Sequence, residues 1–202
     1  MRLMVVGQKW LGASVAAALA ARGHLVAAVA VPRLDDRLAR VGAELDADVV
    51  VAERRLPSGA VPPHTDLVVC AHAHCFVGGD ARGRSRLGAI GYHPSLLPRH
   101  RGRDAVEWAI RFGDKVTGGT VYQLDDGADT GPILRQDWCW VRPGDTAETL
   151  WRRELGPIGL RLLPLAVDDL SLGRAVPAAQ DATLATFEPA IARGSFGGLL
   201  QP

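Results

Sequence analysis

The chain has 202 residues, of which 48% are hydrophobic and 22% are charged, a balance typical of a folded globular protein and not of a disordered one. Its net charge of +1 provides no broad basic field for nucleic acid or an anionic membrane surface. Three cysteines, Cys70, Cys75 and Cys139, are too few for a disulfide framework and indicate a reducing, cytoplasmic setting.

Apolar strands and helices alternate through the first third of the chain. We predict strands at 2–6, 25–31, 49–51 and 67–70, and helices at 14–21 and 34–43. The first apolar run is too short for a signal peptide or a membrane span. Strands that are apolar on both faces and alternate with helices form parallel sheets covered on two sides. The sequence therefore predicts an α/β fold with a Rossmann-like, doubly wound and mostly parallel sheet.

Two glycines, Gly7 and Gly12, follow the first strand and open the first helix, as glycines do in dinucleotide-binding proteins. Their spacing does not match the G-x-G-x-x-G pattern of such sites. Asp35 and Asp36 lie beyond the second strand, where a ribose-binding acid would sit. We favour close packing of strand and helix over a nicotinamide site.

The pattern changes after residue 117. Two strands, at 118–124 and 133–140, are joined by an Asp- and Gly-rich loop at 125–131. Residues 145–148 resemble a capping box that begins a helix, which we expect to bend or break at Gly156-Pro157 and to end near residue 172. We predict one domain over residues 1–175 and a C-terminal tail or surface arm over 176–202.

His93 follows a short apolar strand at 89–92, and doubly wound sheets present ligands at the carboxyl ends of their strands. Its imidazole can accept and return a proton near neutral pH. Asp129, in the glycine-rich loop, is able to orient such a ring and stabilise its charged form. The residues alone leave a second interpretation open, in which His93 is an ordinary loop residue and Asp129 a turn-forming acid.

Four side chains that can ligate metals lie within six residues, at Cys70, His72, His74 and Cys75. Zinc sites usually combine close pairs that are separated by longer intervals. We therefore expect no metal here. We expect instead a buried strand that leads into a pocket-lining loop.

Three segments resemble the folate-dependent formyltransferase family: residues 92–102 (Tyr-His-Pro-Ser-Leu-Leu-Pro-Arg-His-Arg-Gly), 113–115 (Gly-Asp-Lys) and 125–134 (Asp-Asp-Gly-Ala-Asp-Thr-Gly-Pro-Ile-Leu). The motif looks closest to that of the hydrolase domain of 10-formyltetrahydrofolate dehydrogenase and is also similar to that of methionyl-tRNA formyltransferase. The resemblance implies that residues 1–175 are a catalytic domain. It also implies transfer of a formyl group from 10-formyltetrahydrofolate to a small amine, with small-molecule substrates only and no metal.

The same resemblance implies roles for particular residues. His93 and Asp129 match the catalytic histidine and aspartate of the family. The positions expected to contact substrate are His74, Phe76, Val77, Gly78, Gly91, Ser95, Arg99, Leu124, Asp125, Asp126 and Gly127. For Ser95 and Arg99, a structural role in the turn is an equally good interpretation.

One residue departs from the family pattern. Most members carry an asparagine two residues before the histidine, where this chain has Gly91. An oxyanion donor of this kind typically contributes two to three orders of magnitude in rate. This departure keeps two alternatives open, a hydrolase that releases formate and a catalytically weak folate-binding protein. Because nothing after residue 175 resembles a second domain, we do not expect a tRNA acceptor.

Overall fold

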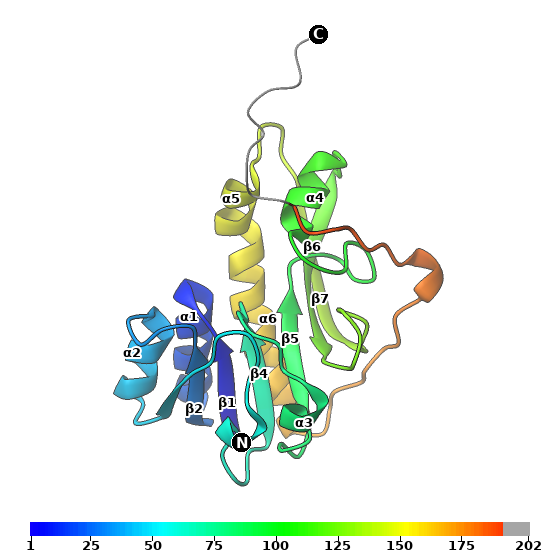
Figure 1. Cartoon of the computed structure of the whole chain (residues 1–202). Helices are drawn as coiled ribbons and strands as arrows, with labels where there is room; N and C mark the ends of the chain where they lie inside the picture. Colours follow the sequence, from blue (N-terminus) through cyan, green and yellow to red (C-terminus); the bar gives the residue numbers. More distant parts are fainter. Residues whose placement is uncertain (192–202) are drawn as a thin grey trace.

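The computed structural model of the protein, which describes residues 1–191, is built on a seven-stranded sheet with the order β3-β2-β1-β4-β5-β6-β7 (Figure 1). The strands are β1 Arg2–Gly7, β2 Leu25–Val31, β3 Asp48–Val51, β4 Leu67–Ala71, β5 Ala89–His93, β6 Val116–Gln123 and β7 Ile133–Trp140. The first five strands are parallel, and β6 and β7 add to them in antiparallel fashion. The predicted mostly parallel α/β sheet is therefore confirmed.

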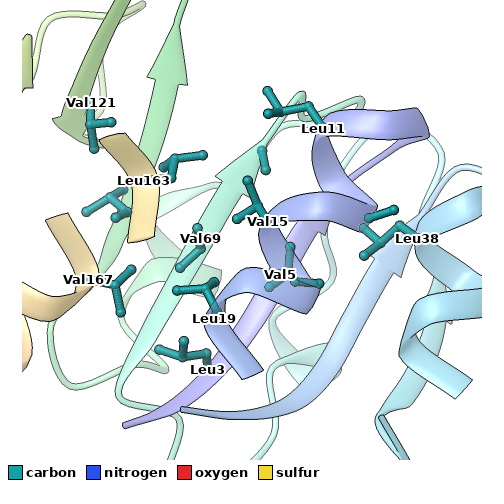
Figure 2. Packing of buried hydrophobic residues seen from close by; sticks show 14 of the residues in the cluster. Leu3, Val5, Leu11, Val15, Leu19, Leu38, Val69, Val121, Leu163 and Val167 are labelled. Carbon is teal, nitrogen blue, oxygen red and sulfur yellow. The ribbon is translucent and has the colours of Figure 1, made fainter. Parts of the chain in front are cut away.

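Helices cover one face of this sheet. They are α1 Lys9–Ala21, α2 Arg37–Glu44 and α6 Gly156–Ser171, with shorter helices α3 Gly79–Arg82, α4 Ala105–Arg111 and α5 Ala147–Leu150 elsewhere. Leu19 of α1 and Leu163 of α6 are fully buried in the same cluster as Val69 of β4 (Figure 2). Burial of each such side chain stabilises the fold by about 1.5–3 kcal/mol. The opposite face is covered by the segment between β3 and β4, which contributes the buried side chains of Leu56 and Val61.

The first helix begins five residues earlier than the sequence pattern predicted, at Lys9 and not at Ser14. The carboxylate of Asp36 accepts hydrogen bonds from the backbone N–H of Lys9, at 3.0 Å, and from that of Leu38, at 2.8 Å. Asp36 therefore caps α2 and also fixes the start of α1. A side chain at Gly7 would place its Cβ 2.1 Å from the carbonyl oxygen of Ala71, which confirms that this glycine serves close packing.

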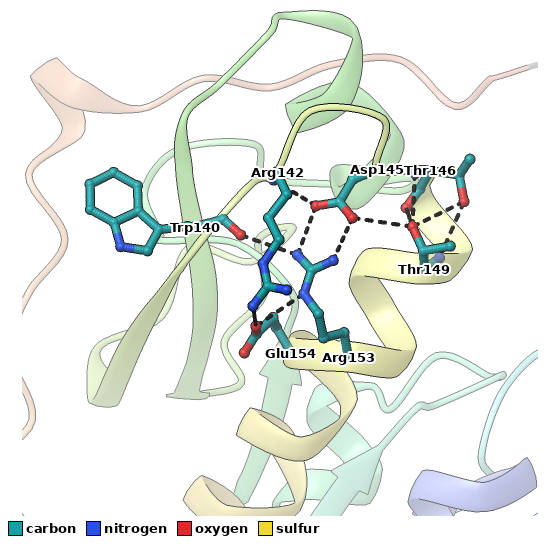
Figure 3. Close-up of polar contacts among 7 residues, drawn as sticks. All are labelled: Trp140, Arg142, Asp145, Thr146, Thr149, Arg153 and Glu154. Carbon is teal, nitrogen blue, oxygen red and sulfur yellow. Dashed lines mark hydrogen bonds and ion pairs between the residues drawn. The ribbon is translucent and has the colours of Figure 1, made fainter.

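The late helical segment differs from its prediction in two ways. Its cap is formed by Thr146 and Thr149, each of which accepts a hydrogen bond from the backbone N–H of the other, and not by the residues at 145 and 148. Asp145 instead pairs with Arg153 at 2.7 Å (Figure 3). We expected a bend or a break at Gly156-Pro157: the chain stays helical there, and a π-helical turn, Trp151–Leu155, joins α5 to α6 immediately before Gly156. Pro157 is the second residue of α6, directly after this π-helical turn.

After α6 the chain turns back along the antiparallel half of the sheet. Ala178 pairs with Ile133 of β7 through two hydrogen bonds of 2.8 Å, and Phe187 forms a bridge with Arg101. Residues 176–191 therefore lie against the loops that follow β5 and β6, while residues 192–202 of the expected tail lie outside the described part of the chain. No helix among residues 1–191 is long and apolar enough to cross a membrane.

Candidate active site

A cavity of about 1310 Å³ opens at the carboxyl ends of β4 and β5. The strand order of the sheet reverses between β1 and β4, and ligands of doubly wound sheets bind at such switch points. The walls combine the loop after β4, the end of β5 and the loop between β6 and β7 with part of α5 and the turn that follows it. Segments far apart in the sequence thus meet around one cavity.

His93 is the last residue of β5, and its side chain is buried. Its Nε2 lies 2.6 Å from the backbone carbonyl oxygen of His100. Because a carbonyl only accepts hydrogen bonds, we assign the proton of the neutral ring to Nε2. The lone pair then resides on Nδ1, which lies 3.5 Å from Oδ2 of Asp129. Nδ1 is therefore the ring nitrogen that faces the carboxylate of Asp129.

Asp129 is held from several sides. Its Oδ2 accepts a hydrogen bond of 2.7 Å from the backbone N–H of Gly102, and its Oδ1 accepts one from the hydroxyl of Tyr122. Its backbone adopts a φ of +56°, a left-handed conformation that aspartate tolerates better than most residues. The side-chain amide of Gln180 donates to the carbonyl oxygens of Asp129, at 2.9 Å, and Gly131, at 2.7 Å. The loop conformation and the carboxylate orientation are therefore both fixed by hydrogen bonds.

A second buried histidine supports the loop that contacts His93. The ring of His100 lies 2.9 Å from Asp114 and 3.1 Å from Glu188, and Asp114 also pairs with Arg99 at 2.7 Å. Burial tends to raise the pKa of Asp114, but the hydrogen bonds from Arg99 and His100 outweigh burial and lower it. This cluster ties the loop after β5 to residues near the end of the described chain.

Most residues expected at the site line the cavity. They are His93, Asp129, Phe76, Val77, Gly91, Leu124, Asp125, Asp126 and Gly127. Four other residues that we expected to contact substrate are not among those that line the cavity: His74, Gly78, Ser95 and Arg99. His74 donates from Nε2 to the carbonyl of Ala52 at 2.7 Å, and Gly78 precedes α3 beside the guanidinium of Arg55.

Ser95 and Arg99 also lie away from the cavity wall. The hydroxyl of Ser95 donates to the carbonyl of Arg99 at 2.6 Å, and Arg99 pairs with Asp114. Both side chains are thus engaged within the turn after β5. Their contacts favour the structural interpretation, and their substrate contacts stay predictions.

The cysteine- and histidine-rich segment does not gather around one point. Within residues 1–191, no three histidine, cysteine or acidic side chains lie close enough together to hold a metal ion. Burial raises the pKa of Cys70 to about 12, so its thiol is protonated at neutral pH. Metals bind the thiolate and not the thiol. His72 lines the cavity, and its ring lies 5.5 Å from that of Trp151.

Four groups of the site were not foreseen from the sequence: the carbonyl of His100, the N–H of Gly102, the hydroxyl of Tyr122 and the amide of Gln180. The first two are backbone groups, which no residue type reveals. The sequence places Tyr122 in a strand but does not show that this strand pairs with β5. Gln180 lies in a segment whose composition indicated only a tail.

Known proteins are similar to this chain in sequence and structure. The formyl transferase family matches residues 33–164. Cytosolic 10-formyltetrahydrofolate dehydrogenase of Xenopus laevis is 34% identical over 202 residues, covering 94% of this chain and 22% of that protein. Methionyl-tRNA formyltransferase of Anaeromyxobacter sp. (strain K) is 42% identical over 121 residues, covering 60% of this chain and 38% of that protein.

The fold also matches solved structures. Glycinamide ribonucleotide transformylase 1 from Symbiobacterium toebii superposes with a TM-score of 0.75 at 27% sequence identity, over 90% of this chain and 94% of that one. The chain therefore matches nearly the whole of that transformylase. By contrast, it spans only 22% of the length of the dehydrogenase.

Proposed function

Because the chain belongs to the formyl transferase family, as its motifs predicted, we propose that it transfers a formyl group from 10-formyltetrahydrofolate to a small amine. The observation that carries this proposal is the buried pair of His93 and Asp129, with Nδ1 and Oδ2 separated by 3.5 Å, in the wall of a cavity of about 1310 Å³. A pair of this kind is able to accept a proton from a nucleophile and return it to a leaving group.

The proposed reaction forms a C–N bond between the formyl carbon and the acceptor nitrogen and breaks the C–N bond between the formyl carbon and N10. The acceptor nitrogen attacks the formyl carbon, and the formyl oxygen takes up the negative charge of a tetrahedral intermediate. Nδ1 of His93 accepts the proton that the acceptor nitrogen loses, and the charged ring is stabilised by Asp129. When the bond from carbon to N10 breaks, the ring donates that proton to N10. The products are the formylated amine and tetrahydrofolate, and His93 returns to its initial state.

The walls of the cavity suit a flat, partly polar donor. Val77 and Leu124 are apolar wall residues, and Phe76 is half exposed beside them. The loop that contains Asp125 and Gly127 lines the cavity together with Asp129. These contacts support binding of the pterin between the loop after β4 and the loop after β6.

A second candidate is hydrolysis of 10-formyltetrahydrofolate to formate and tetrahydrofolate. It is favoured by Gly91, which offers no side-chain donor for a formyl oxygen, and by the similarity to 10-formyltetrahydrofolate dehydrogenases. In this reaction water replaces the amine, and the same two residues move its proton. A protein that binds folate with little turnover is the third alternative.

We also propose a domain organisation for the chain and a cytoplasmic location for the protein. We assign the catalytic groups to residues 1–175 and regard residues 176–191 as a surface arm. Within the arm, Gln180 bonds the loop that carries Asp129, so the arm supports the site without supplying a reacting group. Cys70, Cys75 and Cys139 are free thiols, which fits a cytoplasmic location.

The test is incubation of the protein with 10-formyltetrahydrofolate while tetrahydrofolate and formate are followed separately. Parallel reactions contain no acceptor, glycinamide ribonucleotide, a sugar-nucleotide amine, an alkyl hydroxylamine or methionyl-tRNA. Tetrahydrofolate that forms only with a small amine, without formate, is the expected result. Equal amounts of formate and tetrahydrofolate without acceptor identify the hydrolase. Tight folate binding without turnover rejects both enzymatic proposals, and turnover with methionyl-tRNA alone rejects the small acceptor.

A further inference from the structure

Gly91 and Tyr122 lie opposite each other on the antiparallel strands β5 and β6. Directly opposed residues of such a pair project to the same face of the sheet. A Cβ atom added at Gly91 would lie 2.9 Å from Cδ1 of Leu124 and 3.4 Å from Cε1 of Tyr122. The space that a side chain at position 91 would occupy is therefore taken by the ring of Tyr122 and by Leu124.

The hydroxyl of Tyr122 donates a hydrogen bond to Oδ1 of Asp129. Burial, and then the nearby charge of Asp129, raise the pKa of this phenol well above its usual value, so it keeps its proton and remains a donor. The other carboxylate oxygen, Oδ2, is held by the N–H of Gly102 and faces His93. With one donor on each oxygen, rotation of the carboxylate about its Cβ–Cγ bond would break a hydrogen bond.

We propose that Tyr122 is a positioning residue that holds the Asp129 carboxylate against Nδ1 of His93, and that Gly91 is the residue whose missing side chain admits the tyrosine ring. Gly91 thus contributes to the site indirectly, because it leaves room for the ring of Tyr122. The expected effects on kcat rest on the proposed function, whereas the expected effect on the distance between His93 and Asp129 does not.

The first test replaces Tyr122 by phenylalanine, which keeps the ring and removes only the hydroxyl. We expect kcat to fall about 10- to 100-fold, as for the loss of one hydrogen bond to a charged group, while the KM for 10-formyltetrahydrofolate stays within about twofold. Tyr92→Phe is the matched control, because the hydroxyl of Tyr92 donates to the backbone carbonyl of Leu155 and not to Asp129. Equal kcat values for the two variants would overturn the proposal.

A double-substitution cycle separates positioning from general destabilisation. If Tyr122 acts through Asp129, Tyr122→Phe should reduce kcat little further when Asp129 is already asparagine. Multiplicative losses in the double variant would show that the tyrosine acts independently of Asp129, contrary to the proposal.

The role of Gly91 is tested with side chains of two sizes. Gly91→Ala needs only a shift of the flexible end of Leu124, so we expect it to lower kcat less than Gly91→Asn does. Gly91→Asn must displace the ring of Tyr122, and we expect a loss of at least about tenfold. An asparagine variant that is more active than the wild type would contradict the proposed role of Gly91.

Crystal structures of the wild type and of Tyr122→Phe test whether Tyr122 positions the carboxylate of Asp129, and this test needs no measurement of activity. The separation of Nδ1 of His93 from Oδ2 of Asp129, 3.5 Å in the wild type, should increase beyond about 4 Å in the variant. An unchanged separation would overturn the positioning role. A wild type that turns over no acceptor would reject the proposed function, and this comparison would still decide the role of Tyr122.

Discussion

The imidazole of His93 and the backbone carbonyl of His100 are joined by a hydrogen bond of 2.6 Å, which determines the ring nitrogen that faces Asp129. Since Nε2 is occupied by this bond, Nδ1 is the atom directed towards the carboxylate. The ring of the residue that presents the carbonyl is itself hydrogen-bonded to Asp114 and lies 3.1 Å from Glu188. The protonation pattern of the site thus depends on a loop that is held by side chains outside the cavity.

Substitution of either member of the proposed pair should remove turnover. We expect His93→Asn and Asp129→Asn each to reduce kcat by about 10² to 10⁴, because each removes a group that moves or stabilises the proton. Circular dichroism should show that both variants keep the fold. The exposed histidine His64 supplies a matched control, and His64→Asn should keep full activity. Rates equal to wild type in either site variant would reject the assignment.

The bond from Gln180 to the loop of Asp129 should matter for the order of that loop. We expect Gln180→Ala to accelerate amide hydrogen exchange across residues 125–131 and to lower kcat about threefold to tenfold, since both carbonyls lose a donor. Asp181→Asn, a neighbouring substitution that keeps the capping oxygen of a short helix, serves as control. Unchanged exchange in the alanine variant would show that the arm does not support the loop.

The Asp114 cluster predicts a defined dependence of stability on pH. Because Arg99 and His100 hold the folded-state pKa of Asp114 below its unfolded value, its contribution is present above the unfolded-state pKa of about 4. That contribution is lost as the pH falls through the lower folded-state pKa. Asp114→Asn should therefore cost about 1–3 kcal/mol of unfolding free energy at pH 7 and much less at pH 2.

Urea unfolding at the two pH values measures this difference. Asp35→Asn is the control, because Asp35 forms an exposed ion pair with Arg33 and should contribute at most about 1 kcal/mol. A cost for Asp114→Asn that is the same at both pH values would contradict the linkage.

The buried cysteines should resist alkylation in the folded protein. Burial raises the pKa of Cys70 to about 12 and that of Cys139 to about 11, and thiols react as thiolates. We expect iodoacetamide at pH 8 to leave both unmodified in the native protein and to modify both in urea, as measured by mass spectrometry. Rapid labelling of Cys70 in the native state would contradict its burial.

The sequence alone predicted the parallel half of the sheet, because strands that are buried on both faces appear as continuous apolar runs. It also indicated His93 and Asp129, since both lie in a motif whose residue types are specific. It did not predict α3 or α4, which are short and carry weak periodicity. The boundary of α1 was missed because the helix start is fixed by Asp36, 27 residues away.

The tertiary structure decided how the proposed pair is held. The pairing of β5 with β6 brings Tyr122 opposite Gly91, and this register is not apparent from either strand alone. The return of the chain after α6 brings Gln180 to the loop of Asp129. Hydrogen bonds to backbone groups depend on position and not on residue type. The sequence therefore indicated the two residues of the proposed pair, whereas only the folded chain specified the atoms that orient them.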